Sequence, residues 1–433
     1  MTNPSSTKFA VLGAALIAIS YGLARFAFGL FVPPIRDDLG LRPAQIGMIS
    51  ALPLISFIFA TVIASLIADR MGARITAIIS GLFGTVGLGV ISQASGAFSL
   101  GIGVVFCGIC TGLMMPALTA AMQAMVNRAL HGRVSSVMNA GTSIGVVVAV
   151  PVVLMLESAW RMAYLSFAVI AGIGVLAAWR MLPSVSPVTP TDAAPAPPIS
   201  RLQWARLLRL SLFAFAMGFV SAAYWIFAPD LVITLGELPA DATGWLWFAA
   251  GLAGLGGAIA ADLADRNNPP ITHSLMLMML AASMALIAAS PNNLLLTVFS
   301  ALVFGLAYMS LTGLYLMTGI RLLPGRLSLG PVLPFLAVSL GQAVGSPVLG
   351  LLIEQTGYAN AFSLFASISI VVAIISPLYP RQLEQEWDEE VIEDTGLQAA
   401  YDHQLHDDEG EPYRGIEIEE KTKTAEAERI DEN

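Results

Sequence analysis

Charged residues are scarce in this chain. Only 12% of its 433 residues are Asp, Glu, Lys or Arg, whereas 56% are hydrophobic; in soluble proteins about 25% of residues are charged. A water-soluble protein cannot bury so much apolar surface in one core, so the composition excludes an ordinary soluble enzyme or binding domain. We expect a protein that lies in a lipid bilayer.

Cysteine is nearly absent as well. The two that occur, Cys107 and Cys110, lie three residues apart in one apolar run, which excludes a disulfide framework and favours a packing role for both. The sequence also lacks a nucleotide-binding loop, a metal-ligand cluster and a nucleophile constellation. We therefore expect no cofactor, no metal, no nucleic-acid partner and no enzymatic activity.

Long apolar runs are what the chain has in place of charge. A membrane-spanning helix needs about 20 apolar residues, because every backbone polar group must be satisfied within the segment. Twelve runs meet this need, at residues 9–32, 46–68, 75–93, 98–125, 134–156, 164–182, 207–228, 245–263, 271–289, 294–319, 332–353 and 361–379. The sequence thus predicts an all-α membrane protein with twelve transmembrane helices, the first of them retained as a span.

The chain also repeats itself. The segment SLIADRMGAR around Asp69 returns in weaker form as ADLADRNN around Asp265, at an offset of 196 residues. Gly141 recurs as Gly341 at an offset of 200. Because the offset drifts so little, we interpret the chain as two homologous halves of six helices each.

Four parts follow from this repeat and from the composition. They are an N-terminal six-helix half at residues 1–182, a central cytoplasmic linker at 183–206, a C-terminal six-helix half at 207–380 and a disordered acidic tail at 381–433. The tail carries 19 acidic and five basic residues, a composition typical of a solvated segment. The linker is rich in proline, and the basic stretch 201–209 that overlaps its end is read either as an interfacial helix or as charge flanking the seventh span.

Lys and Arg are distributed unevenly between the predicted loops. Arg36, Arg42 and Arg161 fall on one side of the membrane and twelve others on the opposite side. Positive residues concentrate on the cytoplasmic side of membrane proteins. We therefore expect both termini in the cytoplasm and a multi-pass protein of the cytoplasmic (inner) membrane.

The segment SLIADRMGAR, between the second and third spans, resembles the loop signature of the major facilitator superfamily, G-x-L-A-D-R-x-G-R-[RK]. The resemblance covers residues 9–380, with Ser65 in place of the first Gly and Ala73 in place of one basic residue. It implies the major facilitator fold and a gate in which the loop Asp pairs with cationic and helix-end groups in one conformation. The gating residues would be Asp69, Arg70, Gly72, Arg74, Asp265 and Arg266.

One charge lies deep inside a span. Arg25 comes sixteen residues after Phe9, or about 24 Å along a helix that rises 1.5 Å per residue, and no acidic residue lies within one turn of it. A buried Arg is costly unless it is paired or hydrated. It is interpreted either as an anion-binding residue of a central cavity or as a side chain that extends to the outer headgroups.

Polar and aromatic residues of other spans are candidates for the same site. Tyr21 shares a helical face with Arg25, and by the repeat Arg25 corresponds to Ser221, one turn before Tyr224. Tyr308 and Gln342 lie at the middle of the tenth and eleventh spans. The predicted substrate-binding residues are therefore Arg25, Tyr21, Tyr224, Tyr308 and Gln342.

We expect a monomeric secondary transporter that takes up a small organic anion by alternating access, as a symporter coupled to protons or sodium. No Asp or Glu lies unambiguously inside a span, and Asp230 and Asp262 are near span ends. Export of drugs or metabolites driven by protons is the alternative, and a membrane sensor with an acidic signalling tail is a third. The first span also resembles that of the YbfB/YjiJ-like and cyanate-permease-like bacterial branches.

Overall fold

A computed structural model describes residues 4–127, 130–156, 159–182, 199–267, 269–323 and 329–376. The side chains of residues 4–5, 65–66, 69, 156 and 258–270 are not among those described. The predicted tail, residues 381–433, and most of the predicted linker lie outside the described residues.

The described part of the chain is helical, and the first membrane-crossing segment is interrupted. It comprises α1 (Pro4–Ile17), the π-helix η1 (Ala18–Phe26), α2 (Ala27–Leu30) and α3 (Val32–Leu39). The sequence predicts one uninterrupted helix over 9–32. Two consecutive prolines at the start of α3 lack the N–H groups that would continue α2, so the chain breaks at Phe31 and a new helix begins.

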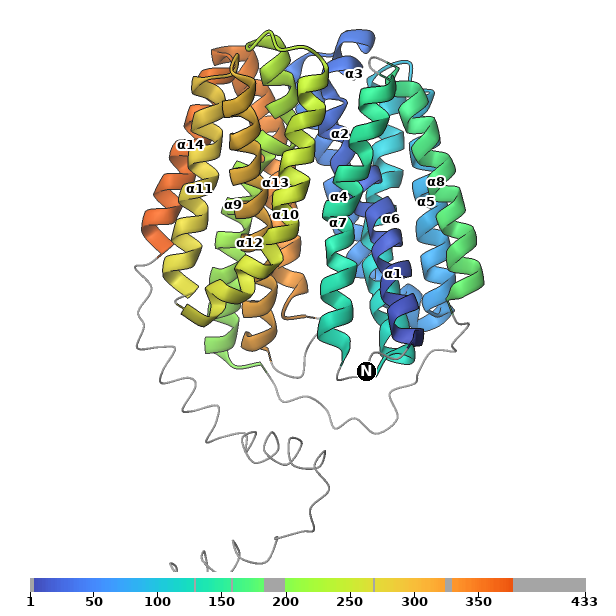
Figure 1. The fold of residues 1–433 in the computed structure, drawn as a ribbon. Coiled ribbons are helices and arrows are strands. Elements are labelled where there is room, and N and C mark those ends of the chain that lie inside the picture. Colours follow the sequence, from blue (N-terminus) through green and yellow to red (C-terminus); the bar gives the residue numbers. More distant parts are fainter. Residues whose placement is uncertain are drawn as a thin grey trace, which may run out of the picture. The chain divides into compact units, whose positions relative to one another are not determined.

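The remaining helices follow the predicted spans. In the first half they are α4 (Pro43–Met71), α5 (Ala73–Ser92), α6 (Ala97–Met125), α7 (His131–Leu156) and α8 (Trp160–Met181); in the second half they are α9 (Arg201–Thr234), α10 (Asp241–Asn267), α11 (Pro269–Ala289), α12 (Leu294–Leu322), α13 (Val332–Thr356) and α14 (Tyr358–Ile375). Within the described residues, eleven spans are long and apolar enough to cross a membrane. The helix α10, only part of whose side chains are described, is a further long helix of the bundle (Figure 1).

The two halves pack their helices in the same pattern. In the first half α4 and α5 pack on α6, α5 packs on α8, and α7 packs on α1 and η1. The equivalent helices of the second half do the same, since α10 and α11 pack on α12, α11 packs on α14, and α13 packs on α9. The halves meet through two related pairs, α4 with α13 and α7 with α10 (Figure 1). The sequence repeat therefore corresponds to a repeated helix arrangement.

The repeated glycines allow the closest of these contacts. A Cβ atom at Gly141 of α7 would lie 2.2 Å from the carbonyl oxygen of Ala14, and one at Gly341 of α13 would lie 2.0 Å from that of Phe215. A side chain at either position would push the two helices apart. Each half thus uses a glycine to bring its fifth helix against its first.

The basic stretch 201–209 is not a separate interfacial helix. It forms the first turns of α9, which runs without interruption from Arg201 to Thr234. The Ser200 hydroxyl caps this helix by accepting a hydrogen bond from the backbone N–H of Gln203. The interpretation as charge flanking the seventh span therefore describes this segment.

Candidate functional site

The π-helix η1 holds Arg25 where the two halves face each other. The guanidinium Nη2 of Arg25 donates hydrogen bonds to Gln342 Oε1 at 3.0 Å and to Ser339 Oγ at 3.3 Å, both on α13. Its Nη1 has no hydrogen-bond partner among the described residues, and none of the ion pairs found between them includes Arg25. Within the described part of the chain the positive charge therefore has neutral hydrogen-bond partners only, and one nitrogen retains unused donors.

Gln342 connects Arg25 to two further helices. While its Oε1 accepts from Arg25, its Nε2 donates to Tyr308 Oη on α12 at 3.1 Å and to Ser221 Oγ on α9 at 3.4 Å. Gln342 and Tyr308 are 3% and 4% exposed. A buried amide with both ends bonded has a fixed orientation, so the carbonyl end of Gln342 is held toward the guanidinium.

Aromatic rings enclose this polar group. The Arg25 guanidinium carbon lies 4.9 Å from the ring centroid of Phe57 and 5.2 Å from that of Phe26. Trp225 packs edge-on against Tyr308, with ring centroids 5.2 Å apart. Cation–π contacts of this kind stabilise a desolvated guanidinium without neutralising its charge. The set formed by Arg25, Ser221, Tyr308, Ser339 and Gln342 is called the Arg25 cluster below.

The backbone beside Arg25 is also fixed. The indole Nε1 of Trp247 on α10 donates to the Phe26 carbonyl oxygen at 3.1 Å, at the end of η1. A Cβ atom at Gly22 would lie 2.4 Å from Gly145 Cα of α7. Short π-helical segments occur frequently at functional sites, and here the segment is held by both halves.

Three of the five predicted substrate-binding residues lie in the Arg25 cluster: Arg25, Tyr308 and Gln342. Tyr21 is buried one turn before Arg25 and contacts Phe57 edge-on at 6.4 Å, so it borders the cluster. Tyr224 lies elsewhere: its hydroxyl bonds to Ser300 Oγ at 2.9 Å, and its ring stacks on Phe304 inside the second half.

The predicted gating residues are described in part. Gly72 ends α4 with φ +82°, a backbone conformation that favours glycine, and Arg74 donates to the Trp179 carbonyl oxygen of α8. Arg70 is exposed. The side chains of Asp69, Asp265 and Arg266 lie outside the described residues, as does the Asp262 side chain.

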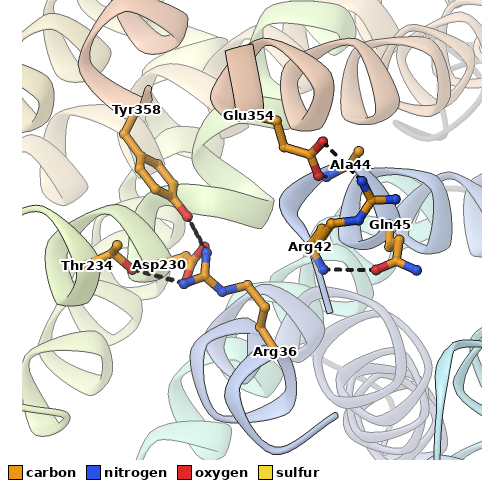
Figure 2. A network of polar contacts seen from close by, with 8 residues as sticks. All are labelled: Arg36, Arg42, Ala44, Gln45, Asp230, Thr234, Glu354 and Tyr358. Carbon is orange, nitrogen blue, oxygen red and sulfur yellow. Dashed lines mark hydrogen bonds and ion pairs between the residues drawn. The ribbon is translucent and has the colours of Figure 1, made fainter. Parts of the chain in front are cut away.

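A second polar network joins the halves at the end of the bundle that holds α3, called the Arg36 end below. Arg36 Nη1 of α3 donates to Asp230 Oδ2 of α9 at 2.8 Å and to Tyr358 Oη of α14 at 2.7 Å (Figure 2). The Tyr358 hydroxyl in turn donates to Asp230, and Thr234 Oγ1 lies 3.5 Å from the other carboxylate oxygen. The Asp230 carboxylate is thus bonded from three directions.

Two further ion pairs lie at the Arg36 end. Arg42 and Glu354 face each other at 3.8 Å between α4 and α13, and Glu354 also accepts from the Ala44 amide (Figure 2). Arg161 pairs with Asp38 at 2.5 Å inside the first half. The three arginines that the sequence places together on one side of the membrane therefore all lie at one end of the bundle.

The sequence alone does not identify this second network. Asp230 stands at the end of a predicted span, and its partner Arg36 comes 194 residues earlier. The available signal is the offset of 196, which matches Pro33 with Pro229 and so places Arg36 and Asp230 at nearly equivalent depths of their halves.

Comparisons with known proteins give one family match. The family model described as the Major Facilitator Superfamily matches residues 14–328. The "Hexuronate transporter" of Bacillus subtilis (strain 168) is 30% identical over 166 residues, which are 37% of this chain and 37% of that protein. The match thus spans well under two thirds of the relative's length.

Solved structures share the fold. A mutant of the nucleoside transporter NupG superposes with a TM-score of 0.72 at 15% identity, covering 85% of this chain and 98% of that one. A POT family transporter in complex with a thioalcohol conjugated peptide gives 0.69 at 14% identity, covering 85% and 95%. A bacterial homolog of the human lysosomal transporter Spinster gives 0.67 at 14% identity, covering 87% and 96%.

Proposed function

Because the chain belongs to the major facilitator superfamily, and so is a membrane transporter of a small molecule, we propose that its substrate is a small organic anion whose carboxylate binds Arg25. Transport would follow alternating access, in which the halves separate first at one end of the bundle and then at the other. The direction of the proposed transport is uptake across the cytoplasmic membrane, with both termini in the cytoplasm.

The unpaired charge of Arg25 is the observation that carries this proposal. A guanidinium in a low-dielectric site without a carboxylate is costly, and such residues in membrane proteins mark substrate or ion pathways. Arg25 has neutral partners on α13, and its Nη1 has none among the described residues. Since a guanidinium binds a carboxylate through two parallel hydrogen bonds, an anionic substrate supplies what this site lacks.

The neighbours of Arg25 favour a substrate with hydroxyl groups. Ser339, Tyr308 and Gln342 offer hydroxyl and amide groups that exchange hydrogen bonds with a polyhydroxylated molecule, and Phe26 and Phe57 offer ring faces. The name of the curated relative supports the same class, because a hexuronate is a sugar acid with one carboxylate. A hexuronate is therefore the first substrate to test.

Counterflow in proteoliposomes tests the substrate class without requiring a coupling ion. Vesicles that contain the purified full chain and unlabelled glucuronate are diluted into labelled glucuronate. We expect a transient accumulation of label that protein-free vesicles do not show. Unlabelled galacturonate should suppress the accumulation, whereas glucose, which lacks the carboxylate, should not.

The same vesicles distinguish the alternative. If sugar acids and other small carboxylates give no counterflow, and a cationic dye is transported instead, the anion proposal is wrong and the export of drugs or metabolites takes its place. Retention of counterflow in the presence of excess glucose, together with its loss in excess galacturonate, supports the anion site.

A further inference from the structure

Asp230 is a buried carboxylate that the anion site does not use. Its side chain is 1% exposed, and it is the one buried acidic residue among the described side chains. It lies near the end of α9, nine residues after Ser221 of the Arg25 cluster. At a helical rise of 1.5 Å per residue the two are about 13 Å apart along the axis, so Asp230 belongs to a separate site.

The groups around Asp230 come from three helices. Arg36 of α3 supplies the positive charge at 2.8 Å, Tyr358 of α14 donates its hydroxyl, and Thr234 of α9 itself lies at 3.5 Å (Figure 2). Of the other charged residues that the structure describes at this end, Asp37, Glu237 and Asp241 are exposed, Asp38 pairs with Arg161, and Glu354 pairs with Arg42. Arg36 is thus the cation that compensates Asp230.

The ion pair joins the two halves. Arg36 belongs to the first half, whereas Asp230 and Tyr358 belong to the second. A carboxylate taken out of water must keep a cation or bind a proton, because an uncompensated buried charge is strongly unfavourable. A separation of the halves at the Arg36 end would withdraw the Arg36 cation with α3 and leave Asp230 with neutral partners.

We propose that Asp230 is the proton-binding site that couples transport to a proton gradient, and that Arg36 and a proton occupy it in alternation. This inference rests on the proposed function and adds the coupling ion to it. When the Arg36 end opens, the carboxylate takes a proton from the water on that side. When the Arg36 end closes, Arg36 replaces the proton and the O–H bond breaks. The proton leaves as hydronium into the water at the opposite end of the bundle, which is then open.

The alternation has a defined pH dependence. Asp230 binds the proton when the Arg36 end is open and not when it is closed, so a lower pH favours the conformation in which this end is open. Without Arg36 this pH dependence reverses. The closed conformation then buries Asp230 without a cation, so it is favoured only when the carboxyl group is protonated.

Distance measurements between spin labels test this without a substrate. The labels are placed at Met48 of α4 and Leu351 of α13, which are exposed near the Arg36 end, in a chain whose Cys107 and Cys110 are replaced by Ala. In the parent protein the longer-distance population should grow as the pH falls between about 9 and 4. In Asp230→Asn the population should not change with pH.

Two further variants make the result specific. Asp38→Asn removes a carboxylate at the same end whose partner, Arg161, lies within the same half, and it should titrate like the parent. Arg36→Gln should show the reversed sign, with the shorter-distance population growing as the pH falls. A parent-like titration in Asp230→Asn, or an unreversed one in Arg36→Gln, overturns the proposal.

Transport assays separate this inference from the proposed function. In glucuronate counterflow, Asp230→Asn should remain active, slowed by no more than about tenfold. It should lose the accumulation of glucuronate driven by a pH gradient, which Asp38→Asn should keep. Counterflow with no response to the pH gradient in the parent protein refutes the proton site but leaves the anion site intact. If no sugar acid or other small carboxylate gives counterflow and a cationic dye is transported instead, the anion site is refuted, and the distance titration alone decides on Asp230.

Discussion

At the scale of single residues, Arg25 combines a charge, a fixed orientation and an unused donor. Its Nη2 is held by Gln342 and Ser339, which leaves Nη1 free among the described residues. This geometry leads to a prediction about the shape of the cation as well as its charge. A lysine at this position keeps the charge but cannot form two parallel hydrogen bonds to a carboxylate.

Arg25→Lys should raise the KM for glucuronate by about ten- to a hundredfold, the effect of losing part of a charge-assisted contact worth about 1.5–3 kcal/mol. Arg25→Ala should abolish transport while the amount of protein in the membrane stays the same or rises, because a costly buried charge is gone. Uptake kinetics and membrane abundance measured on the same vesicles check both.

Arg161→Lys is the matched control, because Arg161 is 41% exposed and pairs with Asp38 away from the cluster. It should leave the KM unchanged. An unchanged KM in Arg25→Lys would show that substrate binding does not require a guanidinium at this position, and the anion site would have to be abandoned.

At this scale the sequence predicts a site residue when its side chain is polar and its neighbours along the chain are apolar. Arg25 and Gln342 stand out because an apolar run contains few such groups. Tyr224 shares a helical face with Ser221, yet α9 packs on both α12 and α13, so Ser221 reaches Gln342 of α13 and Tyr224 reaches Ser300 of α12. Helical spacing gives a shared face, whereas the neighbouring helix that each side chain contacts depends on the packing.

At the scale of helices, the spans are predictable because their length and apolar composition are fixed by the bilayer. The interruption of the first span is less so. Pro33 and Pro34 indicate a break, but the π-helical turn from Ala18 to Phe26 carries no sequence signal that we recognise. This segment packs on α7 at Gly145 and accepts a hydrogen bond from Trp247 of α10, and such contacts between distant residues are not visible in the local sequence.

The close packing of α13 on α9 leads to a prediction. A Cβ atom at Gly345 would lie 2.4 Å from the Phe219 carbonyl oxygen, so Gly345→Ala must move α13, the helix that carries Gln342. We expect the variant to lose about 1–3 kcal/mol of stability. The melting temperature in detergent, monitored by size-exclusion chromatography after heating, measures the loss of stability.

Gly89→Ala serves as the control for this substitution. Nothing lies within 4 Å of a Cβ atom at Gly89 of α5, and alanine is favoured over glycine inside a helix by about 0.5–1 kcal/mol. Its melting temperature should therefore stay the same or rise. Equal losses in the two variants would show that the contact with Phe219 is not the cause.

At the scale of the whole molecule, the internal repeat predicts both the number of helices and their arrangement. Equivalent helices pair alike in the two halves, since each half descends from the same pattern of apolar faces and glycines. The contacts between the halves are not repeated in sequence: Arg36 pairs with Asp230 and Arg42 with Glu354. They were therefore not predictable from one half or from the offset alone.

Two ion pairs at the Arg36 end provide a test of motion between the halves. Arg42 and Glu354, 3.8 Å apart, belong to different halves, whereas Asp38 and Arg161 both belong to the first half. If the halves move as rigid bodies about the Arg25 cluster, a covalent link between Arg42→Cys and Glu354→Cys must hold this end closed. A link between Asp38→Cys and Arg161→Cys restrains no such motion.

With Cys107 and Cys110 replaced by Ala, a short bis-methanethiosulfonate, which links two thiols through disulfides, should stop glucuronate counterflow in the Arg42→Cys/Glu354→Cys protein. A reducing agent, which cleaves these disulfides, should restore it. The Asp38→Cys/Arg161→Cys protein should be cross-linked to the same extent, as judged by mass spectrometry, and continue to transport. Because the expected orientation places this end outside, a reagent that cannot cross the membrane should suffice in intact cells. Undiminished transport in the fully cross-linked first protein would show that the Arg36 end does not open during the cycle, since a substrate cannot pass an end that is held shut.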